Sequence, residues 1–394
     1  MRIAVLPSWL STNGGGIWEV AGHLARALAE GGSDEVTLVG PADERTPESL
    51  DALGGVRAVP CASSGPERFG YARGLLPALR ALEPDVVHAH GIWRYSALAA
   101  LRWHRETGRP LMASPHGNLD AWALARSRAK KAVVGAWFQR PQLEAAACVH
   151  ALTAAELRSV RDYCGGGAPP VAVVPNGVWP PAGPVRRGPR WRGAEVPAGA
   201  RVLLFFGRLS PQKGLESLLR AWAQLRAGDD PAMREWHLVV AGWSDGEYGR
   251  VLKALSDELG IGGTAHFVGP QFHADREATF AAADAFVLSS VSEGLPMTVL
   301  EAWSFSLPVL MTEACNLPGG FRAGAAYELP PTLDGLAAAL RERLAGDAAE
   351  LKETGRRGRE LVEREFAWTR IAEMHRSVYS WTLNGGPRPA FVSG

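Results

Sequence analysis

The sequence predicts an α/β protein with two Rossmann-like, doubly wound domains that face a cleft. The 394 residues are more than one domain usually holds. Short apolar runs alternate with helical patterns, which is typical of a parallel sheet covered by helices. This alternation stops at a stretch rich in Pro, Arg and Gly and then starts again. We therefore expect an N-terminal domain over 1–180, a linker over 181–200 and a C-terminal domain over 201–365. A last helix and tail, 366–394, would cross back to the first domain.

In the first half, a glycine-rich turn at Gly14–Gly16 separates the first strand from an amphipathic helix over Ile17–Ala29. The predicted strands of this half are Ile3–Leu6, Val36–Val39, Val86–His88 and Leu111–Ala113.

The second half repeats the rhythm, and a final helical pattern covers Trp368–Trp381. Its predicted strands are Val202–Phe206, Trp236–Ala241, Ala265–Val268 and Ala285–Leu288, and its helices are Lys213–Arg226, Glu247–Leu259 and Ala274–Ala282.

Composition excludes several classes of protein. The formal net charge is +1, so no global field attracts nucleic acid. The four cysteines are widely spaced without a C-x-x-C pair, which argues against a disulfide framework or a zinc site and fits a reducing cytosol. The N-terminus is typical of a buried strand rather than a signal peptide, and no apolar stretch is long enough to span a bilayer. We expect a cytoplasmic protein, with peripheral membrane contact as an open alternative.

The most informative segment is Ser292–Glu301, which follows the apolar strand Ala285–Leu288. Pro296 is predicted at the first position of a helix, since its fixed φ suits a helix start. The amides that follow form an anion site at the positive end of the helix dipole. Glu293 in the loop and Glu301 in the helix flank that site, and carboxylates accept hydrogen bonds from sugar hydroxyls. The pattern therefore predicts a nucleotide-sugar site.

A second segment, Phe206–Gly214, also joins an apolar strand to a helix. Arg208 and Lys213 lie in this turn, and a guanidinium and an ammonium together could neutralise a diphosphate and the charge that develops as it leaves. The turn is not a Walker loop, because no Gly-Lys-Ser/Thr stands at the required spacing.

These segments carry a resemblance that covers essentially the whole chain. Gly207-Arg208-Leu209 through Lys213-Gly214, with Glu293 and Glu301 downstream, resembles the retaining glycosyltransferases of family 4, which have the GT-B fold. The turn Pro175-Asn176-Gly177-Val178, the N-terminal glycine loop and His88-Ala89-His90-Gly91 match that family too. Gly294-Leu295-Pro296 stands where many members have Phe-Gly, so the backbone that contacts the sugar is expected to differ in shape.

The resemblance implies a role for each matching residue. Arg208 and Lys213 would bind the donor diphosphate, Glu293 the hydroxyls of the transferred sugar, and Glu301 the ribose. In the second half, the backbone of Gly294 would contact the sugar, the amides of Leu295, Met297 and Thr298 would face the phosphates, and Val268 would lie in the 267–270 segment that holds the base edge. In the first half, Gly15 and Gly16 would let the backbone approach the phosphate and the acceptor closely. His116 would border the reacting centre.

The same resemblance implies a mechanism. Family 4 enzymes retain the anomeric configuration, by a front-face substitution in which the leaving phosphate deprotonates the acceptor hydroxyl. Cofactors and metal ions are not expected. His88, His90 and His116 could suggest a metal site, but histidines at strand ends are more often structural and no acidic partner is evident.

Basic and aromatic residues are concentrated in the predicted helical segment 121–140, which suits an anionic membrane surface or a solvated helix with buried aromatic anchors. The residues are Trp122, Arg126, Arg128, Lys130, Lys131, Trp137, Phe138 and Arg140. The linker arginines Arg186, Arg187, Arg190 and Arg192 are expected to be a solvated hinge.

The sequence therefore predicts a hexosyltransferase that moves a hexose from a UDP- or GDP-sugar to a glycan hydroxyl, and the expected acceptor is a lipid-linked intermediate of a surface polysaccharide. The alternatives are a nucleotide-sugar epimerase, a synthase of a soluble disaccharide, and a non-catalytic module that binds nucleotide-sugars.

Overall fold

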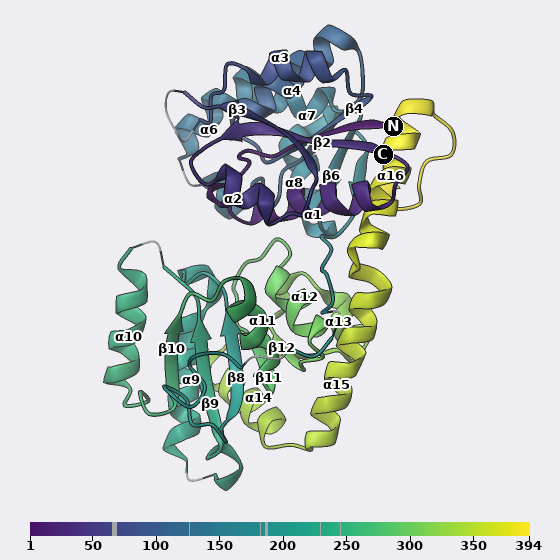
Figure 1. The fold of residues 1–394 in the computed structure, drawn as a ribbon. Coiled ribbons are helices and arrows are strands. Elements are labelled where there is room, and N and C mark those ends of the chain that lie inside the picture. Colours follow the sequence, from purple (N-terminus) through teal and green to yellow (C-terminus); the bar gives the residue numbers. More distant parts are fainter. Residues whose placement is uncertain (65–68, 126, 182, 186–187, 229, 245) are drawn as a thin grey trace. The chain divides into compact units, whose positions relative to one another are not determined.

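The computed structural model describes residues 1–64, 69–125, 127–181, 183–185, 188–228, 230–244 and 246–394 (Figure 1). The chain forms two compact units. The first consists of Met1–Gly177 and Trp368–Gly394, and the second of Val178–Ala367. The described part of the expected linker lies in the second unit, where Trp191 is buried and its indole nitrogen donates a hydrogen bond to Thr279. Arg186 and Arg187 are outside the described residues.

The first unit contains an eight-stranded sheet in the order β14-β7-β6-β5-β4-β1-β2-β3. All described pairings are parallel except β14 with β7. The strands are β1 (Arg2–Leu6), β2 (Glu35–Ala42), β3 (Arg57–Ala62), β4 (Val86–His90), β5 (Leu111–Ser114), β6 (Cys148–Ala151), β7 (Val171–Val173) and β14 (Val392–Ser393).

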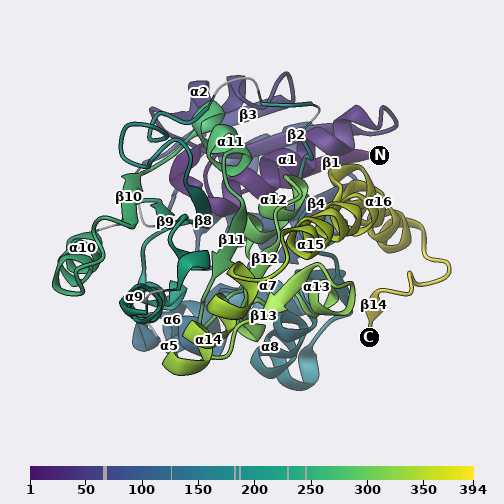
Figure 2. The same cartoon turned by 90° about the horizontal axis from the view of Figure 1, so that it is seen from below.

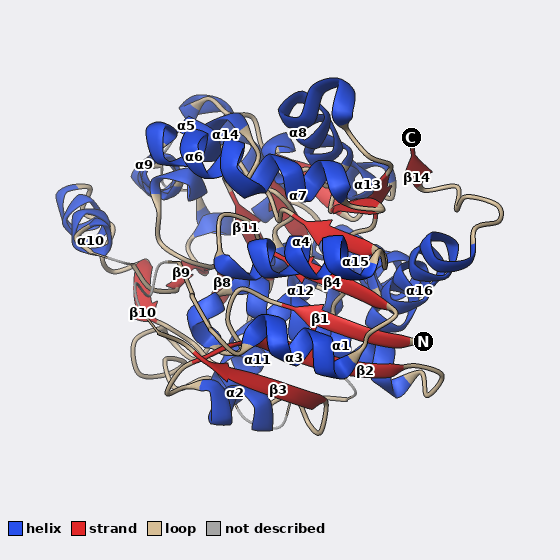
Figure 3. Ribbon diagram, turned by 90° about the horizontal axis from the view of Figure 1, so that it is seen from above, coloured by secondary structure: helices blue, strands red, loops and turns tan. Residues whose placement is uncertain are grey.

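Helices cover both faces of this sheet, and Figure 3 shows the common course of β1, β2 and β4 in red. The helices are α1 (Gly16–Glu30), α2 (Thr46–Asp51), α3 (Leu75–Leu82), α4 (Tyr95–Thr107), α5 (Ala121–Ala125), α6 (Arg128–Val134), α7 (Arg140–Ala145), α8 (Ala154–Cys164) and α16 (Trp368–Asn384). A π-helical turn, Gly135–Gln139, joins α6 to α7. Within the segment 121–140, for which helical structure is expected, α5 ends at Ala125 and α6 begins at Arg128.

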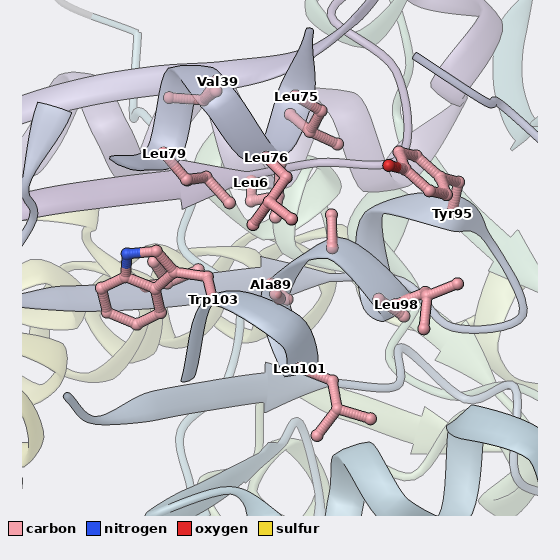
Figure 4. Close-up of a cluster of buried hydrophobic side chains, with 14 of the residues drawn as sticks. Leu6, Val39, Leu75, Leu76, Leu79, Ala89, Tyr95, Leu98, Leu101 and Trp103 are labelled. Atoms are coloured by element: carbon pink, nitrogen blue, oxygen red, sulfur yellow. The ribbon is translucent and has the colours of Figure 1, made fainter. Parts of the chain in front are cut away.

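Side chains alternate across the sheet, so neighbouring residues of one strand have different environments. Val87 and Ala89 of β4 belong to an apolar cluster with side chains of α3 and α4, among them Leu79 and Trp103 (Figure 4). The other face of β4 presents His88 to α16, where Tyr379 is bonded to it. One face is thus an apolar core, and the other carries buried polar groups.

The second unit contains a six-stranded sheet in the order β10-β9-β8-β11-β12-β13, with all described pairings parallel. The strands are β8 (Arg201–Phe206), β9 (Trp236–Ala241), β10 (Ala265–Gly269), β11 (Ala285–Leu288), β12 (Val309–Met311) and β13 (Ala326–Glu328). The helices are α9 (Leu215–Ala227), α10 (Tyr248–Glu258), α11 (His273–Ala281), α12 (Met297–Ser304), α13 (Pro318–Arg322), α14 (Leu333–Leu344) and α15 (Ala348–Leu361). Helices α9 and α14 lie side by side (Figure 2).

Both sheets have the strand order of a doubly wound Rossmann fold, so the prediction of two such domains is confirmed. The order reverses between β1 and β4 in the first unit and between β8 and β11 in the second. Ligands of doubly wound sheets bind beyond the carboxyl ends of the strands at such a reversal. The loops that follow these four strands are therefore candidate ligand-binding loops.

Candidate active site

In the second unit, the loops after β8 and β11 are bonded to each other. The Val291 amide donates to the Gln212 carbonyl at 2.8 Å, and the Ser289 hydroxyl donates to the Lys213 carbonyl at 3.2 Å. Gly214 makes this approach possible: its φ is +66°, and a Cβ there would lie 2.0 Å from the Ser289 carbonyl oxygen. The close contact of the two loops explains why glycine follows Lys213.

Lys213 and Glu293, one from each of these loops, form an ion pair. The Lys213 Nζ lies 2.6 Å from the Glu293 Oε1, and the Ser290 hydroxyl donates to the same oxygen at 2.5 Å. The Asn316 side chain bonds to the Glu293 carbonyl and fixes the backbone. The two charged side chains are 19% and 12% exposed, so they are held in place yet remain partly accessible. Such a pair can bind a ligand's anionic and hydroxyl groups together.

Glu301 is held by a residue that the sequence did not single out. The Arg276 Nη2 lies 2.6 Å and 2.8 Å from the two Glu301 carboxylate oxygens. The guanidinium also lies over the Phe206 ring, at 5.2 Å from its centroid. Arg276 stands on α11, and only the fold brings that helix to α12, so no local pattern could identify it. Its fixed position orients the Glu301 carboxylate.

Helix α12 begins one residue later than predicted: Pro296 is its N-cap, with a ψ of 106°, and Met297 is the first helical residue. The Val299 amide bonds back to the Pro296 carbonyl. Met297 and Thr298 thus occupy the first two helical positions, whose amides have no acceptor within a helix. The Thr298 hydroxyl is buried and has no hydrogen-bond partner among the described residues. The buried hydroxyl of Ser210, in the loop after β8, is likewise unpartnered there. Unpaired buried hydroxyls are costly and favour a ligand that bonds to them.

The other predicted residues of this unit lie on the same loops or on β10. Arg208 is exposed in the loop after β8, Gly294 is partly exposed, and Leu295 is buried beside α12. Val268 is partly exposed on β10, and its carbonyl accepts a hydrogen bond from the Gln271 side chain at 2.9 Å.

In the first unit, Gly15 and Gly16 lie at the start of α1, and both are exposed. Gly15 has a φ of +57°, which itself favours glycine. Gly16 is helical, and a Cβ built there would meet nothing within 4 Å. Among the described residues, no contact therefore requires glycine at position 16, whereas a ligand close to this backbone would.

His116 follows β5 with a φ of +54°, a strained conformation for a residue with a side chain. The buried carboxylate of Glu156 clamps the loop: it accepts from the Gly117 amide at 2.6 Å and from the Leu152 amide at 2.7 Å. Burial raises the pKa of Glu156. The His116 Nε2 lies 3.0 Å from the His90 Nδ1, so two of the predicted histidines are brought together.

A hydrogen-bonded chain connects α16 to β4, β5 and β6, and its direction follows from its ends. The His150 Nε2 must donate to the Val174 carbonyl at 2.7 Å, so its Nδ1 accepts from the Ser114 hydroxyl, also at 2.7 Å. The Ser114 oxygen then accepts from the His88 Nε2 at 2.6 Å, and the His88 Nδ1 accepts from the Tyr379 hydroxyl at 2.7 Å. Every histidine in this chain is therefore neutral.

Three buried histidines, His88, His150 and His375, bring their ring nitrogens within 4.8 Å of one another. A metal ion there would need a nitrogen lone pair from each. The chain described above already engages both nitrogens of His88 and of His150. This donor set therefore fits a hydrogen-bonded core better than a metal site.

Burial keeps the histidines of this region uncharged. It lowers the pKa of His150 to about 4 and that of His116 to about 3. It also lowers the pKa values of His88, His90 and His375 well below their usual range, and neighbouring histidines act in the same direction. These five histidines therefore offer neutral hydrogen-bonding groups at physiological pH.

Solved structures of similar fold are GT-B proteins. Sucrose-phosphate synthase from Thermosynechococcus elongatus matches with a TM-score of 0.74 at 20% identity, over 98% of this chain and all of that chain. Anabaena HepE, in its complex with UDP-glucose, matches with a TM-score of 0.70 at 19% identity, over 96% of this chain and all of that chain. At these identities the likeness establishes the fold, which is GT-B.

Two family models match the sequence. The glycosyl transferase 4-like domain matches residues 15–177, and the glycosyl transferases group 1 domain matches residues 191–360. The chain belongs to the group 1 glycosyltransferases. It is similar to a glycogen synthase of Mycobacterium tuberculosis, at 26% identity over 95% of this chain and 93% of the relative. It is also similar to a D-inositol 3-phosphate glycosyltransferase of Actinosynnema mirum, at 29% identity over 78% of this chain and 76% of the relative.

Proposed function

We propose that the protein is a retaining hexosyltransferase that uses a UDP- or GDP-sugar and transfers the hexose to a hydroxyl of a lipid-linked glycan. The observation that carries the proposal is the Lys213–Glu293 pair, which stands at the strand reversal of the second sheet and is partly accessible. A similar structure described as a complex with UDP-glucose supports a nucleotide-sugar as the donor.

In the proposed reaction, Lys213, Arg208 and the amides of Met297 and Thr298 hold the diphosphate of the donor. Their positive charge and dipoles stabilise the negative charge that grows on the leaving phosphate. Glu293 accepts hydrogen bonds from hydroxyls of the transferred hexose, and Glu301 from the ribose.

The acceptor hydroxyl attacks the anomeric carbon from the side of the leaving group, and a phosphate oxygen takes its proton. The bond from the anomeric carbon to the phosphate oxygen breaks while the new glycosidic bond forms, with retention of configuration. This route needs no protein nucleophile. His116, neutral at physiological pH, would contribute a hydrogen bond to donor or acceptor rather than a charge.

A lipid-linked acceptor agrees with the surface of α6 and the π-helical turn. Val133 and Trp137 are 70% and 60% exposed and stand four residues apart, so they share one face. The basic side chains of Arg128 and Lys130 are exposed on the same segment. Apolar and basic groups together suit an anionic membrane surface. Arg126 lies outside the described residues, and so does the side chain of Trp122. Among the described residues, no helix is both long enough and apolar enough to cross a bilayer.

The test is thermal stabilisation by UDP-, GDP-, ADP- and TDP-sugars, with the free nucleotides beside them. A ligand at a hundred times its dissociation constant adds about 2.7 kcal/mol to the free energy of unfolding. We expect one donor to shift the melting temperature clearly, and Lys213→Ala to abolish the shift. Product analysis with that donor then gives the anomeric configuration and separates transfer from epimerisation. A panel without any shift would contradict the proposed donor site.

A further inference from the structure

A pocket of about 860 Å³ lies in the first unit, formed by segments that leave the carboxyl ends of β4 and β5. Trp93, three residues beyond His90, forms one wall. Lys131 and Gly135 come from the segment after β5, and Tyr163 from the end of α8. The volume falls in the range that holds a small-molecule ligand. His90 is the last residue of β4, and His116 lies just beyond β5. The residues that line the pocket are therefore close in sequence to the predicted reacting centre.

The charged side chains that line the pocket suit an anionic ligand. The described residues of its lining include the cations Arg128, Lys131 and Arg140, and none of these described residues is a carboxylate. The Lys131 Nζ lies over the Trp93 ring, 5.7 Å from its centroid, and the Arg140 guanidinium lies over the Tyr163 ring at 5.2 Å. The Lys131 Nζ also donates a hydrogen bond to the Ala123 carbonyl, so a backbone contact and an aromatic face orient Lys131, and an aromatic face orients Arg140.

The aromatic walls suit a saccharide. The Trp93 and Tyr163 rings meet edge to face, with their centroids 6.0 Å apart. The C–H face of a pyranose is apolar and packs against such rings, while its hydroxyls need polar partners. The Trp93 indole nitrogen is buried and has no hydrogen-bond partner among the described residues.

The position of Trp93 is held at a conformational cost. Its φ of +68° is strained for a residue with a large side chain. The Trp93 amide donates to the buried Gln139 side chain at 2.8 Å, and the Gln139 amide group donates to Gln142 at 2.6 Å. Gln139 ends the π-helical turn that begins at Gly135, and such turns are frequent at functional sites.

We propose that this pocket holds the phosphate-bearing saccharide end of the acceptor, with the phosphate against Lys131, Arg128 and Arg140 and a sugar ring against Trp93 and Tyr163. The assignment rests on the proposed function, because it names the acceptor of that reaction. It requires an anionic acceptor, and it assigns the acceptor phosphate to residues of the first unit, whereas the residues that would hold the donor diphosphate belong to the second.

Two adjacent lysines give a matched test on the full-length chain. Lys131 lines the pocket, whereas Lys130 is exposed and does not. The probes are glucose 1-phosphate and, as the neutral match, glucose, titrated with the donor site saturated by the nucleoside diphosphate that stabilises best. We expect Lys131→Met to weaken glucose 1-phosphate binding about tenfold or more, Lys131→Arg to retain most of it, and Lys130→Met to leave it unchanged. Glucose should bind much more weakly than its phosphate to the wild-type protein.

A second readout separates the pocket from a membrane surface. Sedimentation with vesicles of phosphatidylcholine and phosphatidylglycerol at 7:3 should fall equally in Lys130→Met and Lys131→Met, since bulk surface charge does not depend on the pocket. Equal binding of glucose 1-phosphate by both variants, or equal affinity for glucose and its phosphate, would overturn the proposal. Nucleotide stabilisation should persist in both variants. Its absence from the wild-type protein would instead count against the proposed transferase function.

Discussion

The candidate site residues of the two units differ in charge. In the second unit, Glu293 and Glu301 are ion-paired with Lys213 and Arg276 and remain partly exposed. In the first, His88 and His150 belong to a buried chain of neutral groups. Charged, partly exposed groups suit the proposed diphosphate, which gains charge as it leaves, whereas the buried neutral histidines hold the strands and α16 of the first unit together. The contrast concerns these residues alone, because the proposed acceptor pocket of the first unit is lined by cations.

Neutralising Glu293 should have the largest effect, and it tests whether the charged groups of the second unit act in the reaction. Because Glu293→Gln removes the charge that orients Lys213 and weakens the bonds to sugar hydroxyls, we expect kcat to fall by about 100-fold or more. Glu301→Gln is the matched variant, and it should raise KM for the donor about tenfold with kcat changed much less. Steady-state kinetics with the donor found by thermal stabilisation measures both. Equal effects of the two variants on kcat would contradict the separate roles.

Substitution of Gly16 tests whether a ligand lies close to the backbone of the first unit at this position. Gly16→Ala should leave the free energy of unfolding unchanged or slightly raised, because Gly16 is the first helical residue and a Cβ there meets no described protein atom within 4 Å. If phosphate or acceptor lies against this backbone, the same methyl should lower kcat/KM by about tenfold. Gly14→Ala is the control for a structural requirement, since its Cβ would lie 2.9 Å from the Trp18 Cβ. Unchanged kcat/KM in a stable Gly16→Ala would remove Gly16 from the site.

The sequence predicted the second-unit residues because each group lies within one short segment. The turn from β8 to α9 carries Arg208 and Lys213. Glu293 lies in the turn from β11 to α12, and Glu301 lies within α12. Spacing from a strand end is enough to place such side chains. The Arg276 partner of Glu301 was missed because it stands on another helix, 25 residues away.

In the first unit, the sequence singled out His88, His90 and His116 but not their arrangement. The bonded chain needs Ser114, His150 and Tyr379, from two further strands and a helix close to the C-terminus. Such contacts depend on strand order and on the face to which each side chain points. The pocket beside Trp93 was missed for the same reason, although its basic segment was recognised and interpreted as either a membrane-contacting segment or a solvated helix with buried aromatic anchors.

The last prediction concerns acid stability, which should depend on the buried neutral histidines of the first unit. An unfolded histidine takes up a proton near pH 6.5, whereas burial holds the pKa of His150 at about 4. The unfolded state therefore binds more protons between these values. The stability contributed by His150 is complete above about pH 6.5 and falls as the pH drops towards 4, by up to about 1.4 kcal/mol per pH unit.

His150→Gln should lower stability at pH 7.5, because it disturbs the bonds to Ser114 and Val174, but it should also make the loss below pH 6.5 less steep. Urea unfolding between pH 4.5 and 7.5 measures both quantities. His266→Gln is the control in the second unit, where the ring is only half-buried and its pKa is lowered less severely. An equal dependence of stability on pH in His150→Gln and in the wild-type protein would contradict a contribution of His150 to acid sensitivity, since a merely destabilising substitution leaves that dependence unchanged.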